Sequence, residues 1–263
     1  MDILGLGLGV TREPYLNTGF EGPREATGED PELWFDVTKG IDTVAYDSET
    51  RAISKITNLG SASTLQLSAI EGVGAPIFTP TGGQNSLPYS NHDGEGAAFV
   101  LTDGDGVEQS YNFGSAYTIF MICDNDAESG VSGITGGRSP NAYAFRWSGS
   151  SLLNTVYNEE GFTADTVMPE GAAGFGIATS RVTSSDGTNK ISIRFLAQST
   201  AEEDLAAAAV GTSKIYVGKA NNGTQFFTGK VYEFGLWKKT LTLEQLNNLD
   251  TYVKQKYDFT YPV

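Results

Sequence analysis

The sequence is poor in the residues on which several classes of protein depend. Its 263 residues include one cysteine and one histidine, and 17 Lys and Arg stand against 32 Asp and Glu. A single cysteine excludes an internal disulfide and any zinc site that needs several thiolates. The formal net charge of −15 disfavours nucleic-acid and anionic-membrane partners, because both bind through clustered Lys and Arg.

The sequence also has no long apolar run, and we expect that its first ten residues are not a signal peptide. No stretch approaches the roughly 18 apolar residues that a transmembrane helix needs. Residues 1–10 alternate leucine with glycine, and Asp2 stands where a signal peptide would have basic residues. We therefore expect no membrane partner, no standard export, and folding in a cytoplasm.

Catalytic motifs are scarce as well. A Ser-His-Asp triad would have to use His92, which we expect to be a surface or core-edge histidine, and no Gly-x-Ser-x-Gly elbow is present. Jelly-roll glucanases align carboxylates on one strand face, but Glu202, Glu203 and Asp204 run into alanines. The sequence therefore predicts a protein that is not an enzyme.

What the sequence does contain is a β pattern. Residues 65–69 and 191–195 alternate apolar and polar side chains, as half-buried strands do, and Gly- and Asp-bearing clusters such as 81–85 and 103–106 indicate turns between strands. The run 117–123 is almost continuously apolar, so we expect a central strand covered on both faces, with Cys123 in the core. Residues 184–189 indicate a hairpin loop. Further strands are predicted at 65–69, 143–147, 152–157, 175–179, 191–195 and 215–217.

One helix is predicted, near the C-terminus. Thr242 and Gln245 form a capping-box pair, and Leu246, Leu249 and Val253 follow at helical spacing. Residues 202–210, with four consecutive alanines, leave a short helix and a loose loop both open.

Residues 1–32 differ from the rest of the chain, since no strand or helix period is sustained after Val10. We expect an extended N-terminal arm followed by a single domain over 33–263. A disordered tail is one interpretation of the arm. The other is an anchor in a neighbouring subunit or protein, because clustered apolar side chains mark a contact. Its anchoring residues would be Ile3, Leu4, Leu6 and Leu8.

The segment 215–246 resembles the end of a laminin G-like, concanavalin A-like jelly roll. The residues that match the family pattern in order are Phe227, Gly229, Val231, Glu233, Phe234, Leu236, Trp237, Leu241 and Glu244. The resemblance implies an all-β fold, a two-sheet antiparallel jelly-roll sandwich with one short C-terminal helix. We expect Tyr232, Phe234 and Leu236 to share one strand face, with Glu233 on the other as a structural hydrogen-bonding residue.

An N-terminal arm followed by one acidic sandwich is similar to structural proteins of tailed bacteriophages. The resemblance implies a non-enzymatic virion protein, namely a capsid decoration, head fibre or tail-associated protein anchored to other virion proteins by its arm. A homo-oligomer such as a trimer would suit that role. The alternative function is a carbohydrate-binding module that recognises cell-surface glycans.

Glycan binding needs an exposed aromatic side chain beside polar groups, and Tyr143, Trp147 and Tyr157 are the candidates. Their other interpretation is burial in the core, because aromatic residues that alternate along strands commonly pack there.

Calcium is the one cofactor that the sequence suggests. Asp103 and Asp105, and further along Asp124 and Asp126, could supply hard oxygen ligands at loop edges. Neither pair forms an EF-hand loop, and solvated turns explain the same residues.

Overall fold

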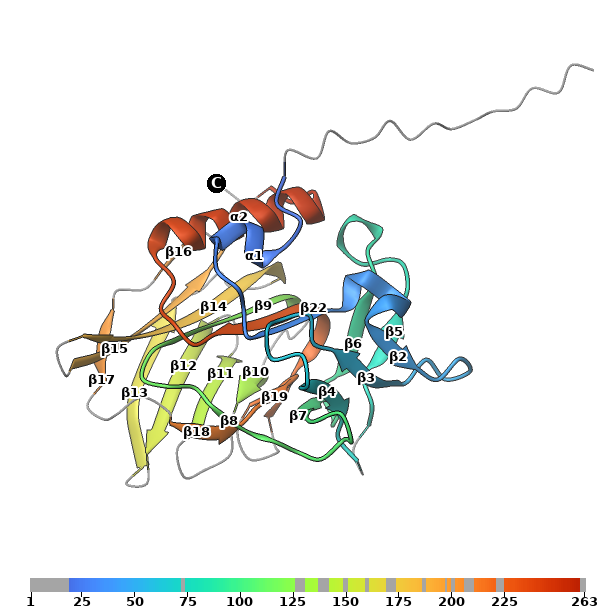
Figure 1. The fold of residues 1–263 in the computed structure, drawn as a ribbon, viewed down its shortest axis with the longest axis horizontal. Helices are drawn as coiled ribbons and strands as arrows, with labels where there is room; N and C mark the ends of the chain where they lie inside the picture. Colours follow the sequence, from blue (N-terminus) through green and yellow to red (C-terminus); the bar gives the residue numbers. More distant parts are fainter. Residues whose placement is uncertain are drawn as a thin grey trace, which may run out of the picture.

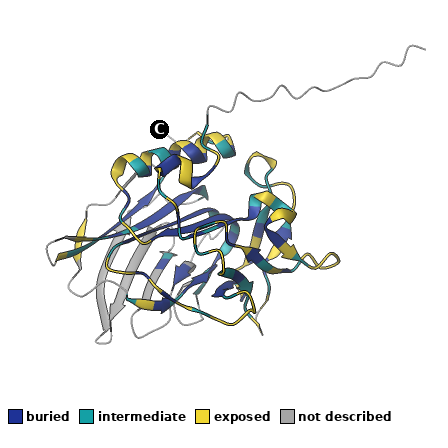
Figure 2. Cartoon of the chain, viewed as in Figure 1, coloured by how far each residue is buried: buried dark blue, intermediate teal, exposed yellow. Residues whose placement is uncertain are grey.

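The computed structural model confirms the predicted all-β sandwich. Two antiparallel sheets, here called sheet A and sheet B, pack face to face, and two helices cover the outer face of sheet A (Figure 1). Buried residues concentrate between these layers (Figure 2). Neither helix in the described part of the chain is long and apolar enough to span a membrane. The structure describes residues 19–71, 74–125, 131–136, 142–148, 151–158, 161–168, 174–185, 188–196, 198–199, 202–205, 211–220 and 225–260.

Sheet A has β14, β9 and β22 at its centre. Its strands in spatial order are β16 (Gln198–Ser199), β15 (Thr188–Phe195), β14 (Gly174–Ser185), β9 (Tyr117–Asn125), β22 (Thr228–Trp237), β6 (Tyr89–Asp93) and β5 (Ile77–Thr79). In addition, β1 (Leu33–Asp36) pairs with β22, and β17 (Glu203–Leu205) pairs with β15. The predicted hairpin loop is confirmed, because Ser185 pairs with Thr188 where β14 turns into β15.

Sheet B forms the opposite layer. Its strands in spatial order are β13 (Gly161–Met168), β12 (Ser151–Asn158), β11 (Ala142–Ser148), β10 (Val131–Gly136), β19 (Tyr216–Val217), β7 (Phe99–Thr102), β4 (Gln66–Ala69), β3 (Ile53–Thr57) and β2 (Val44–Tyr46). Two short ribbons pair β8 (Ser110–Asn112) with β18 (Thr212–Lys214), and β20 (Lys219–Ala220) with β21 (Gln225–Phe226). Two 3-10 helices are η1 (Val37–Asp42) and η2 (Gln84–Ser86). Every strand predicted from the sequence overlaps one of these strands.

Strand β9 shows why a nearly continuous apolar run suits the centre of this fold. Met121 and Cys123 lie in the core between the sheets, whereas Phe120 and Ile122 lie in the core beneath the helices. Because successive side chains of a strand lie on opposite faces, a strand covered on both faces needs apolar residues at every position. The predictions of a central strand and of a buried Cys123 are both confirmed.

The prediction that Tyr232, Phe234 and Leu236 share one strand face is wrong for Tyr232. Phe234 and Leu236 lie in the core between the sheets, but Tyr232 lies beneath the helices. The pairing of β22 with β9 shifts between Val231 and Glu233, as it does at a β-bulge. The bulge interrupts the alternation and leaves Tyr232 and Glu233 together on the side of the helices.

The helix α2 (Leu243–Tyr257) begins at the predicted capping box. The Thr242 side chain accepts the Gln245 N–H at 3.2 Å, and the Gln245 side chain accepts the Thr242 N–H at 2.9 Å. Leu246, Leu249 and Val253 are buried against sheet A, as their spacing predicts. The helix therefore closes one face of the sandwich.

Two short elements differ from the sequence analysis. A helix, α1 (Pro23–Thr27), lies within the segment expected to be extended, and its Ala26 packs in the core beneath α2. Pro23 at its first turn and Gly28 with a φ of 70° at its end favour so short a helix. Residues 203–205 form strand β17 and neither a helix nor a loop, while residues 206–210 lie outside the described residues.

Candidate functional site

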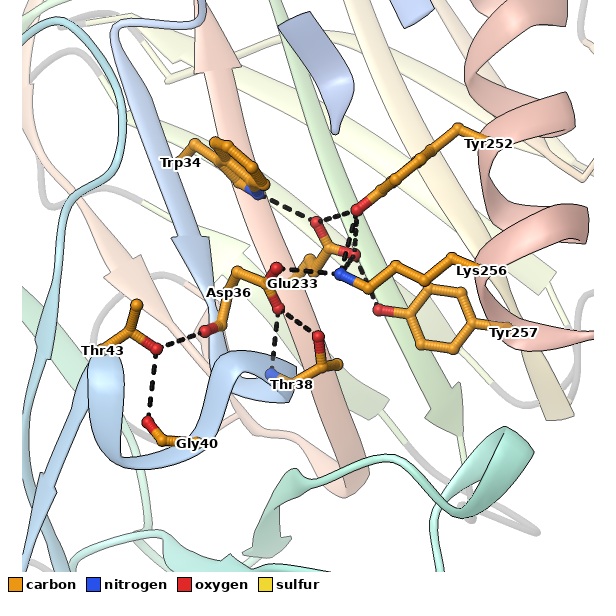
Figure 3. Close-up of polar contacts among 9 residues, drawn as sticks. All are labelled: Trp34, Asp36, Thr38, Gly40, Thr43, Glu233, Tyr252, Lys256 and Tyr257. Carbon is orange, nitrogen blue, oxygen red and sulfur yellow. Dashed lines mark hydrogen bonds and ion pairs between the residues drawn. The ribbon is translucent and has the colours of Figure 1, made fainter. Parts of the chain in front are cut away.

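A fully buried carboxylate, Glu233, is the centre of a polar cluster between β22, β1 and α2 (Figure 3). Its oxygens accept hydrogen bonds from Tyr252 Oη at 2.8 and 3.0 Å and from Tyr257 Oη at 2.7 Å. Lys256 Nζ lies 2.8 Å from one oxygen, and Trp34 Nε1 donates to the other at 2.9 Å. Helix α2 supplies three of these four donors, so the cluster ties the helix to sheet A.

Lys256 joins Glu233 to a second buried carboxylate, Asp36. Its Nζ is 2.8 Å from Asp36 Oδ2, while Asp36 Oδ1 accepts the N–H and the hydroxyl of Thr38 at 2.9 and 2.6 Å. Burial alone would lower the pKa of Lys256, but attraction by Glu233 and Asp36 outweighs it and raises that pKa. Lys256 is therefore a cation shared by two carboxylates.

This geometry suits a structural role for Glu233. Burial, and then the charge of Glu233, raises the pKa of Tyr252 and Tyr257 well above that of an ordinary tyrosine, so both hydroxyls stay donors. Both oxygens of Glu233 already accept hydrogen bonds from the protein, whereas a general base must reach a substrate proton. The prediction of a structural hydrogen-bonding residue at Glu233 is confirmed.

Trp34 connects the polar cluster to the surface. Its indole is half-buried, with Nε1 bonded to Glu233 and the backbone N–H bonded to Asn58 Oδ1 at 2.8 Å. Lys39 Nζ lies 5.7 Å from the ring centroid, within the range of a cation–π contact. The ring is therefore fixed in orientation before any ligand arrives.

Two cavities lie against this ring and a third adjoins them, and together we call the three the Trp34 groove. The first, of about 330 Å³, and the second, of about 380 Å³, are both lined by Trp34, Glu25 and Leu59. The second and the third, of about 400 Å³, share Glu21 and Lys39. Each is within the size range of small-molecule sites, and each combines polar with apolar lining.

The outer face of sheet B carries another cavity, of about 570 Å³. It is lined by hydroxyls such as Ser68 and Thr102, which bond each other at 2.7 Å, and by carboxylates such as Glu108. Glu108 accepts a hydrogen bond from Tyr216 at 2.8 Å and pairs with Lys214 at 2.7 Å. No aromatic ring is among the described residues that line this cavity, so the Trp34 groove is the stronger candidate site.

His92 is not at the surface but fully buried, between the rings of Phe99 and Phe227. Its Nδ1 lies 2.8 Å from the Ala97 carbonyl, which can only accept, so Nδ1 carries the ring proton. Nε2 lies 3.2 Å from Ser90 Oγ. Burial lowers the pKa of His92 to about 4, which keeps the ring neutral in the folded protein.

We expect the protein to lose roughly 3 kcal/mol of stability through His92 as the pH falls from 6.5 to 4. The sign follows from the depressed pKa: in that window the unfolded chain binds a proton that the folded chain does not. A His92→Gln variant removes this titration while keeping every carboxylate. Urea unfolding of both proteins across the window tests the prediction, and parallel pH profiles would contradict it.

The residues proposed from sequence for glycan binding lie in sheet B. Tyr143 and Trp147 belong to β11, where they pair with Val156 and Leu152, and Tyr157 belongs to β12. The structure describes the strands of these three residues but not their side chains, so their role in binding stays a prediction. The anchoring residues Ile3, Leu4, Leu6 and Leu8 lie outside the described residues altogether, and anchoring stays a prediction too.

The residues proposed for calcium have other partners. Asp103 Oδ1 accepts the N–H groups of Asp105 and Val107 at 3.0 and 2.9 Å, as in a turn. Asp124 pairs with Lys230 at 2.8 Å, and Asp126 lies outside the described residues. Within the described ranges, no group of three or more His, Cys, Asp or Glu side chains is placed to hold a metal.

Sequence reasoning missed Trp34 as a site residue, although a signal was present. Alternation along Leu33–Asp36 puts Leu33 and Phe35 into the core between the sheets. The same alternation puts Trp34 and Asp36 on the opposite face. A tryptophan and an aspartate two residues apart, on the strand face that turns away from the core between the sheets, are the signal for a polar site with an aromatic wall.

The chain matches no protein-family model and no curated protein. Among solved structures it is similar to the binding domain of botulinum neurotoxin serotype D, with 7% identity over 87% of this chain and a TM-score of 0.57. The serotype G binding domain aligns over 84% with 9% identity and a TM-score of 0.53. The CBM40 of a Ruminococcus gnavus IT-sialidase aligns over 52%, with 11% identity and a TM-score of 0.42.

The toxin domains share the fold with this chain, and at these identities the similarity extends to the fold alone. The chain spans 52% and 50% of the two toxin domains. The jelly-roll sandwich expected from the sequence is thus confirmed, whereas no comparison supports the laminin G-like family or a phage virion protein.

Proposed function

We propose that this protein is a binding domain that recognises a cell-surface glycan in the Trp34 groove. One observation carries the proposal: a half-buried indole, held in orientation by Glu233, lines two adjoining cavities together with charged side chains. A sugar ring has an apolar C–H face and a rim of hydroxyls. An aromatic ring can cover the face, while carboxylates and amines bond the rim.

The fold supports the same proposal. The two toxin domains that align over most of this chain are described as binding domains. Fold similarity alone does not assign a function, so the argument depends on the groove itself. The saturated hydrogen bonding of Glu233 further favours binding over catalysis. Attachment to a virion through residues 1–32 stays a separate prediction.

We expect Trp34→Ala to weaken glycan binding by roughly tenfold or more, because it removes the apolar wall of two cavities. Binding to a glycan array, followed by calorimetry on the strongest glycan, measures this. Since Trp34 also bonds Glu233, a second variant is needed that leaves the polar cluster intact. Lys39→Ala serves, because Lys39 is exposed and lies over the indole.

The matched control is Lys55→Ala, on strand β3 and outside the residues that line the groove. Weaker binding by both groove variants with unchanged binding by Lys55→Ala supports the site. An array on which the wild-type protein binds no glycan would overturn the proposed function.

A further inference from the structure

The charge of the Trp34 groove points to the class of its ligand. The described side chains that line the three cavities include five carboxylates and three cations. The carboxylates are Glu21, Glu25, Asp30, Asp36 and Asp42, and the cations are Arg24, Lys39 and Lys256. The groove is therefore net negative on a protein whose overall charge is already −15.

Two of the three cations are already engaged by carboxylates. Arg24 Nε pairs with Asp30 Oδ1 at 2.7 Å at the edge of the first cavity. Lys256 Nζ lies 2.8 Å from both Asp36 and Glu233, whose side chains are 1% and 0% exposed. Diverting Lys256 to a ligand would leave two buried carboxylates without their cation, which is costly.

The third cation of the groove is Lys39, and its position suits a neutral ligand. Its ammonium lies 5.7 Å from the indole centroid, where it can donate a hydrogen bond to a hydroxyl on the rim of a sugar bound beside the ring. A carboxylate on the ligand at this place would meet Lys39 but also the exposed carboxylates of Glu21, Glu25 and Asp42. Proteins that select a carboxylate offer it an arginine fork or several converging donors.

The three exposed carboxylates can instead accept hydrogen bonds from the hydroxyl groups of a neutral ligand. A carboxylate is an acceptor only, and hydroxyl groups that donate to it form short, charge-assisted hydrogen bonds. A neutral sugar supplies several such hydroxyls around its ring, whereas an acidic sugar brings a like charge into the same space. Repulsion of that kind is a common source of specificity against the wrong ligand.

We infer that the Trp34 groove selects neutral oligosaccharides and rejects their sialylated or uronic-acid counterparts. This inference rests on the proposed function, because it concerns the ligand of the same groove. It predicts that the acidic member of a matched pair binds roughly tenfold more weakly than the neutral member. It also predicts an affinity for the neutral member that changes little as salt is raised to roughly 0.5 M, since no ion pair is screened.

The test uses the full chain on an array that presents each neutral oligosaccharide beside its acidic counterpart, such as lactose beside 3′-sialyllactose. Preference for the neutral members supports the inference. Equal or tighter binding of the acidic members would overturn it while leaving the proposed glycan-binding function standing. Binding to no member of either kind would overturn the proposed function itself.

A charge-reversal variant separates the groove from the overall charge. Glu25→Lys, on the exposed face of α1, should raise binding of the acidic member several-fold relative to the neutral one. The control Glu49→Lys changes the net charge equally at an exposed turn that does not line the groove. Equal effects of the two variants would show that global charge sets the preference, and would overturn selection by the groove.

Discussion

A Lys256→Met variant is expected to lose about 3–5 kcal/mol of unfolding free energy. The side chains of Asp36 and Glu233 are 1% and 0% exposed, and Lys256 Nζ lies 2.8 Å from each. Methionine keeps most of the apolar stem of lysine but supplies no positive charge. The two carboxylates would then be buried close together without a cation, and removing one partner of a buried ion pair is strongly destabilising.

The matched control is Lys254→Met, two residues earlier in α2 at an exposed position, where a change in unfolding free energy within roughly 0.5 kcal/mol is expected.

Glu233→Gln in the Lys256→Met background removes one of the two carboxylates that Lys256→Met leaves without a cation. The double variant should therefore be more stable than the sum of the two single changes predicts. Urea unfolding of the four proteins measures this coupling. A Lys256→Met loss below about 1 kcal/mol would contradict the assignment of the cluster as a buried ionic network.

Asp250→Ala is expected to cost a similar amount, about 3–5 kcal/mol, in the middle of helix α2. Asp250 forms an ion pair with Arg194 of β15, and their side chains are 7% and 6% exposed. Arg194 also donates to the Leu196 carbonyl and to Asn247 Oδ1, each at 2.8 Å. These bonds hold the guanidinium in place, so Asp250→Ala would leave a fixed, buried positive charge without its carboxylate partner.

Asp204→Ala provides the comparison, because Asp204 also pairs with a cation of β15. Its distance to Lys190 is 4.0 Å, and the two side chains are 79% and 43% exposed. A pair so exposed contributes between 0 and about 1 kcal/mol. Thermal or urea unfolding of both variants measures the difference. Equal losses from Asp250→Ala and Asp204→Ala would show that burial does not set the contribution of these pairs.

Local residue patterns predicted most of the fold. The apolar run of β9 identified a strand covered on both faces, because period-2 alternation disappears only when both faces are buried. The capping box at Thr242 fixed the start of α2, since Thr and Gln at that spacing satisfy the first free N–H groups of the helix. The bulge in β22 was not predicted, because an extra residue in a strand depends on pairing with β9 and leaves no local mark.

Far less of the candidate site could be predicted from the sequence. Glu233 could be recognised as a structural residue, but its partner Lys256 lies 23 residues away along the chain. Asp36, the second carboxylate that Lys256 bonds, lies 220 residues from Lys256. His92 shows the same limit. Its neighbours in sequence suggested a turn at the surface, while its burial comes from Phe99 on β7 and Phe227 before β22.

Composition and local residue patterns were enough to predict an acidic β-sandwich with a C-terminal helix and without the motifs of the common enzymes. Those features follow from composition and from contacts between near neighbours, which repeat along the chain at fixed periods. The place where a ligand could bind depends instead on how distant segments pack together. The Trp34 groove is built from α1, β1, η1 and α2, which meet because α1 and α2 pack on the same face of sheet A and β1 pairs with its strand β22. No periodic pattern encodes such a meeting, since it depends on how the two sheets and the helix layer stack.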